Sequence, residues 1–383
     1  MSSKFEKFPG NSIEIAGRPV GAGHPVFVIA ELSANHHQGF DEAARLIAAA
    51  KQSGADAVKL QTYTPDTITL RCGRPEFQIP GGNTWGGRSL YDLYSEAYTP
   101  WEWHPRLAAI ASECGLILFS TPFDPSAVEF LAGLEMPAYK IASFEIGELE
   151  LIACAARTGK PLIVSTGMAS FAEIEDAVRT ARSEGAGGLA VLKCTSAYPS
   201  PPEEMNLATI AHLAEIFGVT AGLSDHTLGI AAAVTAVALG ASIIEKHFTL
   251  SRDVAGPDSH FSLEPAEFRA MVEGIRVAEQ AVGSVRYGAG PAEAGSVCFR
   301  RSLFAAADIR RGETLTRANV RSVRPGYGLA PKYLPDVLGS AAAGDIEFGT
   351  PLSWELIAGG GRDRAAGHGE LFRREILETA GAR

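Results

Sequence analysis

The sequence has few cysteines, no long apolar run and no excess of basic residues, and each shortage excludes a class of protein. The five cysteines are odd in number and include no Cys-x-x-Cys pair, so neither a disulfide framework nor a zinc ribbon is expected. No stretch reaches the roughly 18 consecutive apolar residues of a transmembrane helix. The first residues, MSSKFEKFPGNSIEI, lack the apolar core of a signal peptide. We therefore expect a cytoplasmic protein that neither enters nor crosses a membrane.

Acidic residues outnumber basic ones, 44 to 34, which gives a formal net charge of −10. Most of the surface should repel a polyanion, so nucleic acid is not an expected partner. An anionic substrate would need a local cationic pocket. With 383 residues, 46% of them hydrophobic, the chain is long enough for one large globular domain and a small one.

Eight short apolar runs alternate with longer amphipathic stretches, which is the pattern of strand and helix pairs on a parallel sheet. The runs are rich in Val, Ile and Leu, as strands buried on both faces should be, and they cover residues 26–32, 56–61, 116–121, 138–143, 161–166, 189–194, 220–225 and 242–247. The stretches 41–52 and 264–282 show helical spacing of apolar residues. Eight consecutive pairs predict an α/β fold of the (β/α)8 TIM-barrel type, because an open doubly wound sheet rarely needs so many.

The rest of the chain divides by composition. The connection 62–100 is rich in aromatic residues and too long for a tight loop, so we expect it to cover the barrel rim. The barrel domain is expected to span residues 1–282, and a Gly/Ala/Ser-rich linker residues 283–299. A compact β-rich module should follow at 300–360, and a mobile tail at 361–383.

The loops that follow barrel strands converge on one mouth, and polar residues are dense at these strand ends. They are Glu31, Lys59, Gln61, Lys140, Ser143, Glu145, Ser165, Thr166, Lys193, Thr195, Ser196, Tyr198, Ser224, Asp225, His226, Glu245, Lys246 and His247. Charges within apolar strands are costly unless they are paired or used. A single buried Lys–Glu pair can be explained by pairing within the fold. Polar residues at the ends of seven strands favour an active site instead.

Two histidines and two lysines suggest particular chemistry. A lone histidine is more often a core residue, but His226 and His247 lie at corresponding positions on adjacent strands and can reach one ion. Such a pair, with open positions for substrate, predicts a catalytic Mn²⁺, Mg²⁺ or Co²⁺ ion. Lys59 and Lys140 can share an anion such as phosphate across the mouth. A buried strand lysine is also the arrangement of a Schiff-base aldolase, which the histidine pair makes the weaker alternative.

Ordered motifs across the barrel resemble the sialic acid synthase family. They are AELSANH (30–36), DAVKLQTYTPDTITL (56–70), EAYTPWEWHP (96–105), STPFD (120–124), PAYKIASFE (137–145), STGM (165–168), KCTSAYPSPPEEMNL (193–207), GLSDHTLGI (222–230), IIEKHFTL (243–250) and GPDSHFSLEP (256–265). The segments 300–316 and 324–329 resemble the family's C-terminal antifreeze-like (SAF) domain. The resemblance implies a metal-dependent transferase that condenses phosphoenolpyruvate with an acyclic amino-sugar aldehyde and water. It also implies release of phosphate by C–O cleavage, and a domain-swapped homodimer.

The resemblance also implies roles for individual residues. Phosphoenolpyruvate is assigned to Lys59, Lys140, Ser143, Ser165 and Ser224, the metal to His226 and His247, proton transfer to Glu31 and Glu145, and the sugar to Gln61, Tyr198, Glu245 and Asp258. Which of the two proton-transfer carboxylates is the base stays open. Arg324 matches an arginine that the SAF domain offers to the sugar's acyl group in the neighbouring subunit; the alternative is an ordinary surface arginine.

Departures from the general family pattern indicate the substrate. Ser196 stands where the family usually has an asparagine that meets both substrates, and the segments 143–145 and 256–259 also differ. These features resemble the pseudaminic acid synthase branch, which uses a 2,4-diacetamido-2,4,6-trideoxy sugar in nonulosonic acid biosynthesis, for example for flagellin glycosylation. An N-acetylneuraminate or legionaminate synthase, and a degenerate barrel that binds a sugar without turnover, are the alternatives.

Overall fold

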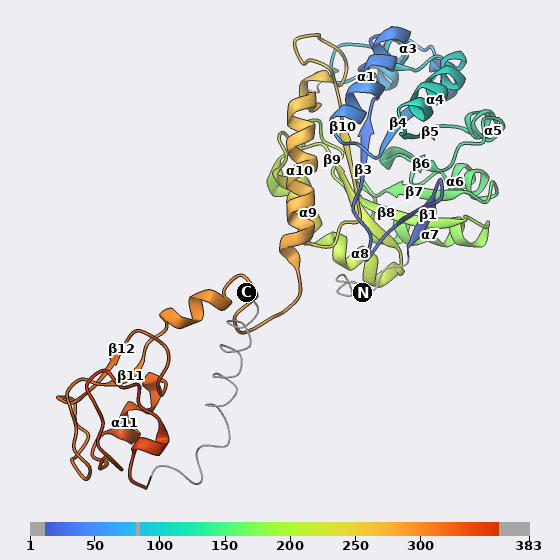
Figure 1. Ribbon diagram of the computed structural model, residues 1–383. Coiled ribbons are helices and arrows are strands. Elements are labelled where there is room, and N and C mark those ends of the chain that lie inside the picture. Colours follow the sequence, from blue (N-terminus) through green and yellow to red (C-terminus); the bar gives the residue numbers. More distant parts are fainter. Residues whose placement is uncertain (1–11, 82–84, 360–383) are drawn as a thin grey trace. The chain divides into compact units, whose positions relative to one another are not determined.

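The computed structural model describes residues 12–81 and 85–359, and the chain forms two units, Met1–Ser284 and Val285–Arg383. The first unit is a closed barrel of eight parallel strands in the order β10-β3-β4-β5-β6-β7-β8-β9, which confirms the predicted fold (Figure 1). The strands are β3 (Phe27–Glu31), β4 (Ala57–Thr62), β5 (Ile117–Pro122), β6 (Tyr139–Ile141), β7 (Pro161–Ser165), β8 (Gly188–Cys194), β9 (Thr220–Asp225) and β10 (Ile243–His247).

Side chains of each strand alternate between the barrel interior and the surrounding helices. The apolar inward positions form one cluster, which contains Phe27, Ile29, Ala57, Phe119, Ala138, Ile163, Ala190, Leu192 and Ile243. Outward residues such as Val28, Leu223 and Ile244 belong to a second, larger cluster beneath the helices. Toward the C-terminal end of each strand, the inward residues that follow this cluster are polar. The barrel floor is therefore apolar and its mouth is polar.

Helices surround the barrel (Figure 1). They are α1 (Phe40–Gln52), α4 (His104–Glu113), α5 (Pro125–Gly133), α6 (Leu149–Ala156), α7 (Phe171–Ser183), α8 (Thr209–Phe217), α9 (Ala231–Ala238) and α10 (Pro265–Val282). Helix α7 begins with a capping box between Ser170 and Glu173, which satisfies backbone N–H groups that have no partner within the helix. Helices α1 and α10 lie within one residue of the predicted stretches 41–52 and 264–282.

An antiparallel hairpin of β1 (Ile13–Ile15) and β2 (Arg18–Val20) precedes the barrel and was not predicted. Its apolar residues, Ile13, Ile15 and Val20, belong to the inner cluster, and Ile13 packs against Gly188 at the start of β8. The hairpin therefore closes the barrel at the end opposite the polar mouth.

The segment expected to be a long loop, residues 62–100, contains the short helices α2 (Pro65–Ile68) and α3 (Leu90–Ala97). Further 3₁₀ turns in this unit lie at Pro75–Phe77, Trp101–Trp103, Ser143–Glu145, Pro202–Glu204 and Ser259–Phe261. The segment is thus partly ordered by its own secondary structure.

The second unit has its own small core. Its antiparallel pair β11 (Ser302–Ala305) and β12 (Val320–Val323) is joined by isolated bridges, such as Phe304 to Pro351. Helix α11 (Leu334–Val337) and 3₁₀ turns at Ala294–Phe299, Pro331–Tyr333 and Trp354–Leu356 complete it. The first of these turns lies within the expected linker. The expected tail, 361–383, lies outside the described residues. Among the described residues, no helix is long and apolar enough to cross a membrane.

Candidate active site

The last inward side chains of the strands form a polar ring at the mouth of the barrel. Strand register brings Glu31 level with Lys59 on one side and with His247 on the other. Ser224 is likewise level with Glu245 and with Cys194. The ring contains Glu31, Lys59, Gln61, Thr121, Lys140, Ser165, Cys194, Ser224, Glu245 and His247. All but Gln61 are buried.

Two lysines and two glutamates form the charged centre of the ring. Lys59 Nζ lies 2.6 Å from Glu31 Oε2 and 3.6 Å from Glu245 Oε1. Lys140 Nζ lies 3.9 Å from Glu245 Oε2, so Glu245 lies between the two ammonium groups. Lys59 Nζ also donates to Thr121 Oγ1 at 2.9 Å, and Lys140 Nζ donates to Ser165 Oγ at 2.6 Å. The two ammonium groups therefore have partners, and both lie beside the same carboxylate, that of Glu245.

Burial works against every charge in this cluster. Although burial opposes its ionisation, the ammonium groups of Lys140 and Lys59 hold the pKa of Glu245 below its ordinary value. Burial lowers the pKa of Lys140, whereas the carboxylates of Glu245 and Glu31 outweigh burial and raise the pKa of Lys59. Burial raises the pKa of Glu31 in spite of the neighbouring Lys59. An anionic substrate would relieve the poor solvation of Lys140.

Glu145 is a separate carboxyl in the 3₁₀ turn that follows β6. Burial raises its pKa to about 7, although the nearby Lys140 ammonium opposes the rise. Its Oε2 atom is buried and has no hydrogen-bond partner among residues 12–81 and 85–359. A carboxyl with a pKa near neutrality, beside the polar mouth of the barrel, is suited to transferring protons.

His226 and His247 lie side by side, with ring centroids 5.3 Å apart. His226 Nδ1 is 2.9 Å from the Thr195 carbonyl oxygen and therefore carries the hydrogen that donates to it, which leaves Nε2 as an acceptor in the neutral ring. Burial lowers the pKa of His247 well below its ordinary value, and its buried Nδ1 has no hydrogen-bond partner in the described part of the chain. Burial opposes protonation of His226, but the neighbouring Cys194 outweighs burial and raises the His226 pKa. Once His226 is neutral, its Nε2 and the unpartnered His247 Nδ1 are the two nitrogens that could bind a divalent metal ion. The described residues contain no cluster of three or more His, Cys, Asp and Glu side chains arranged to hold one.

The remaining predicted residues of this unit join the same mouth. Ser143 Oγ and Ser196 Oγ are 2.7 Å apart, and Ser196 Oγ lies 3.8 Å from Cys194 Sγ. The Tyr198 ring lies 4.4 Å from the His226 ring, measured between centroids. Ser196, which follows β8, therefore contacts Ser143 on one side and Cys194 on the other, and the Cys194 thiol lies 3.9 Å from His226 Nδ1.

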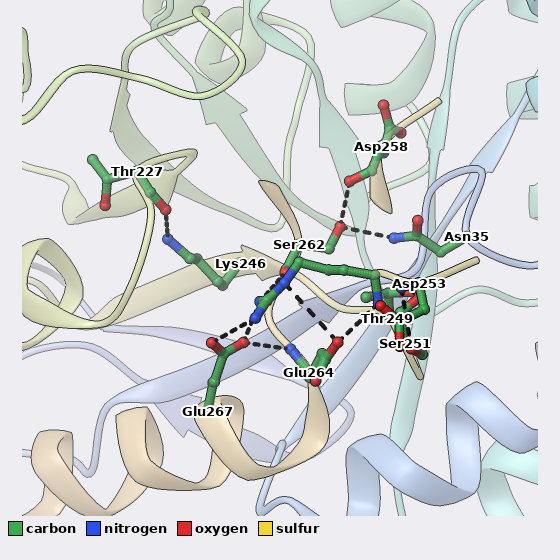
Figure 2. Close-up of polar contacts among 11 residues, drawn as sticks. Asn35, Thr227, Lys246, Thr249, Ser251, Asp253, Asp258, Ser262, Glu264 and Glu267 are labelled. Carbon is green, nitrogen blue, oxygen red and sulfur yellow. Dashed lines mark hydrogen bonds and ion pairs between the residues drawn. The ribbon is translucent and has the colours of Figure 1, made fainter. Parts of the chain in front are cut away.

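Three predicted mouth residues point away from it, which corrects the expectation. Lys193, Asp225 and Lys246 each follow an outward-facing residue by two positions, so alternation turns them toward the helices. Lys246 Nζ lies 2.8 Å from Asp225 Oδ2, and both side chains are fully buried. Lys246 Nζ also donates to the Thr227 carbonyl oxygen (Figure 2). This ion pair fixes the backbone on both sides of His226.

The structure adds residues that the sequence did not single out. Thr121 accepts the Lys59 hydrogen bond, and Ser33 joins Gln61 to Asp258. Trp85, from the long segment after β4, donates through Nε1 to the Pro257 carbonyl oxygen at 2.8 Å, and its ring lies 5.4 Å from that of Tyr198. The aromatic segment therefore reaches Tyr198 and the loop that carries Asp258, as its length suggested.

Arg324 belongs to the second unit and is exposed there. It directly follows β12 and precedes a cis peptide bond to Pro325.

Comparison with known proteins identifies the family. The NeuB family matches residues 46–287, and the SAF domain matches residues 300–358. The pseudaminic acid synthase of Campylobacter jejuni (strain 81-176) is 47% identical over 327 residues, which cover 85% of this chain and 95% of the relative. That of Helicobacter pylori (strain 26695) is 46% identical, over 87% of this chain and 98% of the relative.

A solved structure agrees with the sequence relatives. The crystal structure of the N-acetylneuraminic acid (sialic acid) synthetase of Leptospira borgpetersenii, in complex with citrate, matches with a TM-score of 0.68 and 29% identity, over 76% of this chain and 97% of that one. The matches confirm the resemblance that the motifs carried: the chain belongs to the NeuB family of sialic acid synthases and ends in a SAF domain.

Proposed function

We propose that this protein is a pseudaminic acid synthase. It condenses phosphoenolpyruvate with 2,4-diacetamido-2,4,6-trideoxy-L-altrose and water to give pseudaminic acid and phosphate. The observation that carries the proposal is the 46–47% identity to pseudaminic acid synthases over 95–98% of their length. An N-acetylneuraminate or legionaminate synthase would share the barrel and the charged mouth, so the sugar distinguishes the candidates.

The buried ammonium groups of Lys59 and Lys140 support binding of phosphoenolpyruvate, which carries a carboxylate and a phosphate. The buried hydroxyls of Ser143, Ser165 and Ser224, at the ends of β6, β7 and β9, would supply directional donors. Binding there holds C3 of phosphoenolpyruvate against the aldehyde carbon, so that the new C–C bond forms within the barrel mouth. Water then adds at C2, and phosphate leaves when its C–O bond to C2 breaks.

Glu145 is the better candidate for the group that takes the proton from this water. Its pKa of about 7 lets it be ionised at neutral pH and still hold a proton after transfer. Glu31, in contrast, accepts hydrogen bonds from Gln61 Nε2 and the Ser33 backbone N–H, and it lies 2.6 Å from Lys59. Those contacts suit Glu31 to orienting Lys59 rather than to receiving a proton.

His226 and His247 would hold a divalent metal ion, Mn²⁺, Mg²⁺ or Co²⁺. When bound, such an ion would polarise the aldehyde oxygen as a Lewis acid. The His226 Nδ1–H bond to Thr195, which turns Nε2 away from the backbone as a ligand atom, and the buried, unpartnered His247 Nδ1 fit this role. Two protein ligands leave coordination positions for substrate and water.

A second copy of the chain would complete the site in a domain-swapped homodimer. Phe144, Met168 and Leu228, on the loops after β6, β7 and β9, are each more than 60% exposed at the mouth end of the barrel. Exposed apolar side chains around a polar site are typical of a surface that another domain covers. The SAF domain of the second copy would cover them and offer the exposed Arg324 to the sugar's acyl group.

Phosphate release from phosphoenolpyruvate, assayed with each of three aldehydes, tests the proposal. We expect the highest kcat/KM with 2,4-diacetamido-2,4,6-trideoxy-L-altrose, and much lower values with N-acetylmannosamine and the legionaminic acid precursor. A preference for either of the other two would reassign the enzyme within the family. No phosphate release with any of them, with divalent ions present, would favour the binding protein without turnover.

A further inference from the structure

Ser33 lies at the junction of three polar residues of the mouth. It follows β3 in the loop to α1, it is 3% exposed, and its backbone φ is +44°. This left-handed region favours glycine, and a residue with a side chain is strained there by on the order of 1 kcal/mol. A strained, buried serine suggests that its hydroxyl has a function.

The hydrogen bonds of Ser33 fix the direction of two neighbouring side chains. Its Oγ donates to Asp258 Oδ2, so the same hydroxyl can only accept from Gln61 Nε2, which lies at 3.0 Å. Gln61 Nε2 also donates to Glu31 Oε1 at 3.1 Å. Both amide hydrogens of Gln61 are therefore used within the protein, and its Oε1 is left as an acceptor.

The backbone of Asp258 is held by different residues from its carboxylate. Ser262 Oγ donates to the Asp258 carbonyl oxygen at 2.7 Å, and Asn35 Nδ2 donates to Ser262 Oγ at 2.9 Å (Figure 2). Asn35 Nδ2 also donates to the Phe248 carbonyl oxygen at 2.9 Å, which ties this loop to the end of β10. The Asp258 carboxylate also accepts a hydrogen bond from the Ala34 backbone. Loss of the Ser33 hydroxyl should therefore loosen the carboxylate without releasing the loop.

From these contacts we infer that Ser33 is a positioning residue for the amino-sugar aldehyde. It aims the Gln61 amide oxygen and the Asp258 carboxylate as a pair of acceptors for O–H and N–H groups of the sugar. The inference rests on the proposed function, because it requires a polyhydroxylated acetamido substrate in this part of the mouth. Ser33 should therefore affect binding of the sugar and leave binding of phosphoenolpyruvate unchanged.

Steady-state kinetics of Ser33→Ala and Ser33→Gly test the inference. Both variants remove the hydroxyl, but glycine also relieves the strain at φ +44°, so S33G should unfold at a higher temperature than S33A. We expect the KM for the sugar to rise about tenfold in both, as for the loss of one hydrogen bond to a charged group. The KM for phosphoenolpyruvate should stay close to the wild-type value.

A matched control is Ser120→Ala, which removes a buried hydroxyl that lies 2.6 Å from Thr62 Oγ1, on the outward face of β5. Its KM for the sugar should not change. In an Asp258→Ala background, S33A should raise the sugar KM by less than it does in the wild type, because one of the two side chains that Ser33 aims is already absent.

Three outcomes overturn the inference: an unchanged sugar KM in both Ser33 variants, an equal rise in both KM values, or a full additional effect of S33A in the Asp258→Ala background. Wild-type enzyme that releases no phosphate with any of the aldehydes would refute the proposed function as well. Wild-type turnover combined with unaltered Ser33 variants would refute the role of Ser33 alone.

Discussion

Replacing Glu145 by glutamine should lower kcat and raise the free energy of unfolding, so the two effects of its carboxyl can be measured separately. Burial raises its pKa from 4.5 to about 7. At about 1.4 kcal/mol per tenfold change in proton affinity, the ionised carboxylate is about 3 kcal/mol less stable in the folded than in the unfolded protein. Below pH 4.5 the group is protonated in both states and costs nothing. The cost grows from pH 4.5 to 7 and is complete above pH 7.

The neutral glutamine avoids this cost. Urea unfolding should therefore show E145Q to be more stable than the wild type by up to about 3 kcal/mol at pH 8.5, and about equally stable at pH 4.5. Activity should change in the opposite direction: we expect kcat to fall about 10²- to 10⁴-fold. The wild-type kcat, followed by phosphate release, should rise with pH through about 7 as the carboxylate forms.

Glu129→Gln, an exposed substitution on α5, is the control and should change neither quantity. Two results would refute the reasoning about Glu145. One is a stability difference that is the same at both pH values, which would mean that its pKa is not raised. The other is an E145Q kcat within a few-fold of the wild type, which would return Glu31 as the base.

Three further predictions concern the second copy, the metal and acid stability. If the site is shared, R324A and K59A should each be inactive alone, but mixed and reassembled they should recover about a quarter of wild-type activity, whereas a site within one chain would recover none. Equilibrium dialysis should show that H226A binds Mn²⁺ at least tenfold more weakly than the wild type, and unchanged binding would remove His226 from the ligands. Burial lowers the pKa values of His36 and His104 to about 4, so the free energy of unfolding should decline as the pH falls from 6.5 to 4, by up to about 3 kcal/mol per residue. A His104→Gln variant with the same pH dependence would contradict this.

Much of the barrel could be predicted because its strands are buried on both faces. Each strand is an apolar run between turn residues, and all eight were located. The hairpin at 13–20 was missed because its strands have only three residues each and its turn, Ala16-Gly17, lacks the Asn or Asp typical of such turns. Strands this short carry too little alternation to be recognised.

A ring of charged residues at the mouth was predicted, but three of the residues assigned to it face the helices instead. Counting in steps of two from the inward Glu245 would have excluded Lys246, and the same count from Ser224 would have excluded Asp225. Ser33 could not be found in this way. Its importance depends on a backbone angle and on a contact with Asp258, 225 residues further along the chain.

The central claim is that this barrel joins phosphoenolpyruvate to a 6-deoxy diacetamido sugar with C–O cleavage. The most direct test is to run the reaction with 2,4-diacetamido-2,4,6-trideoxy-L-altrose in ¹⁸O-labelled water and to analyse both products by mass spectrometry. We predict pseudaminic acid that carries the label at C2, and phosphate without it. Labelled phosphate, or no nine-carbon product from this sugar while another aldehyde is consumed, would contradict the account.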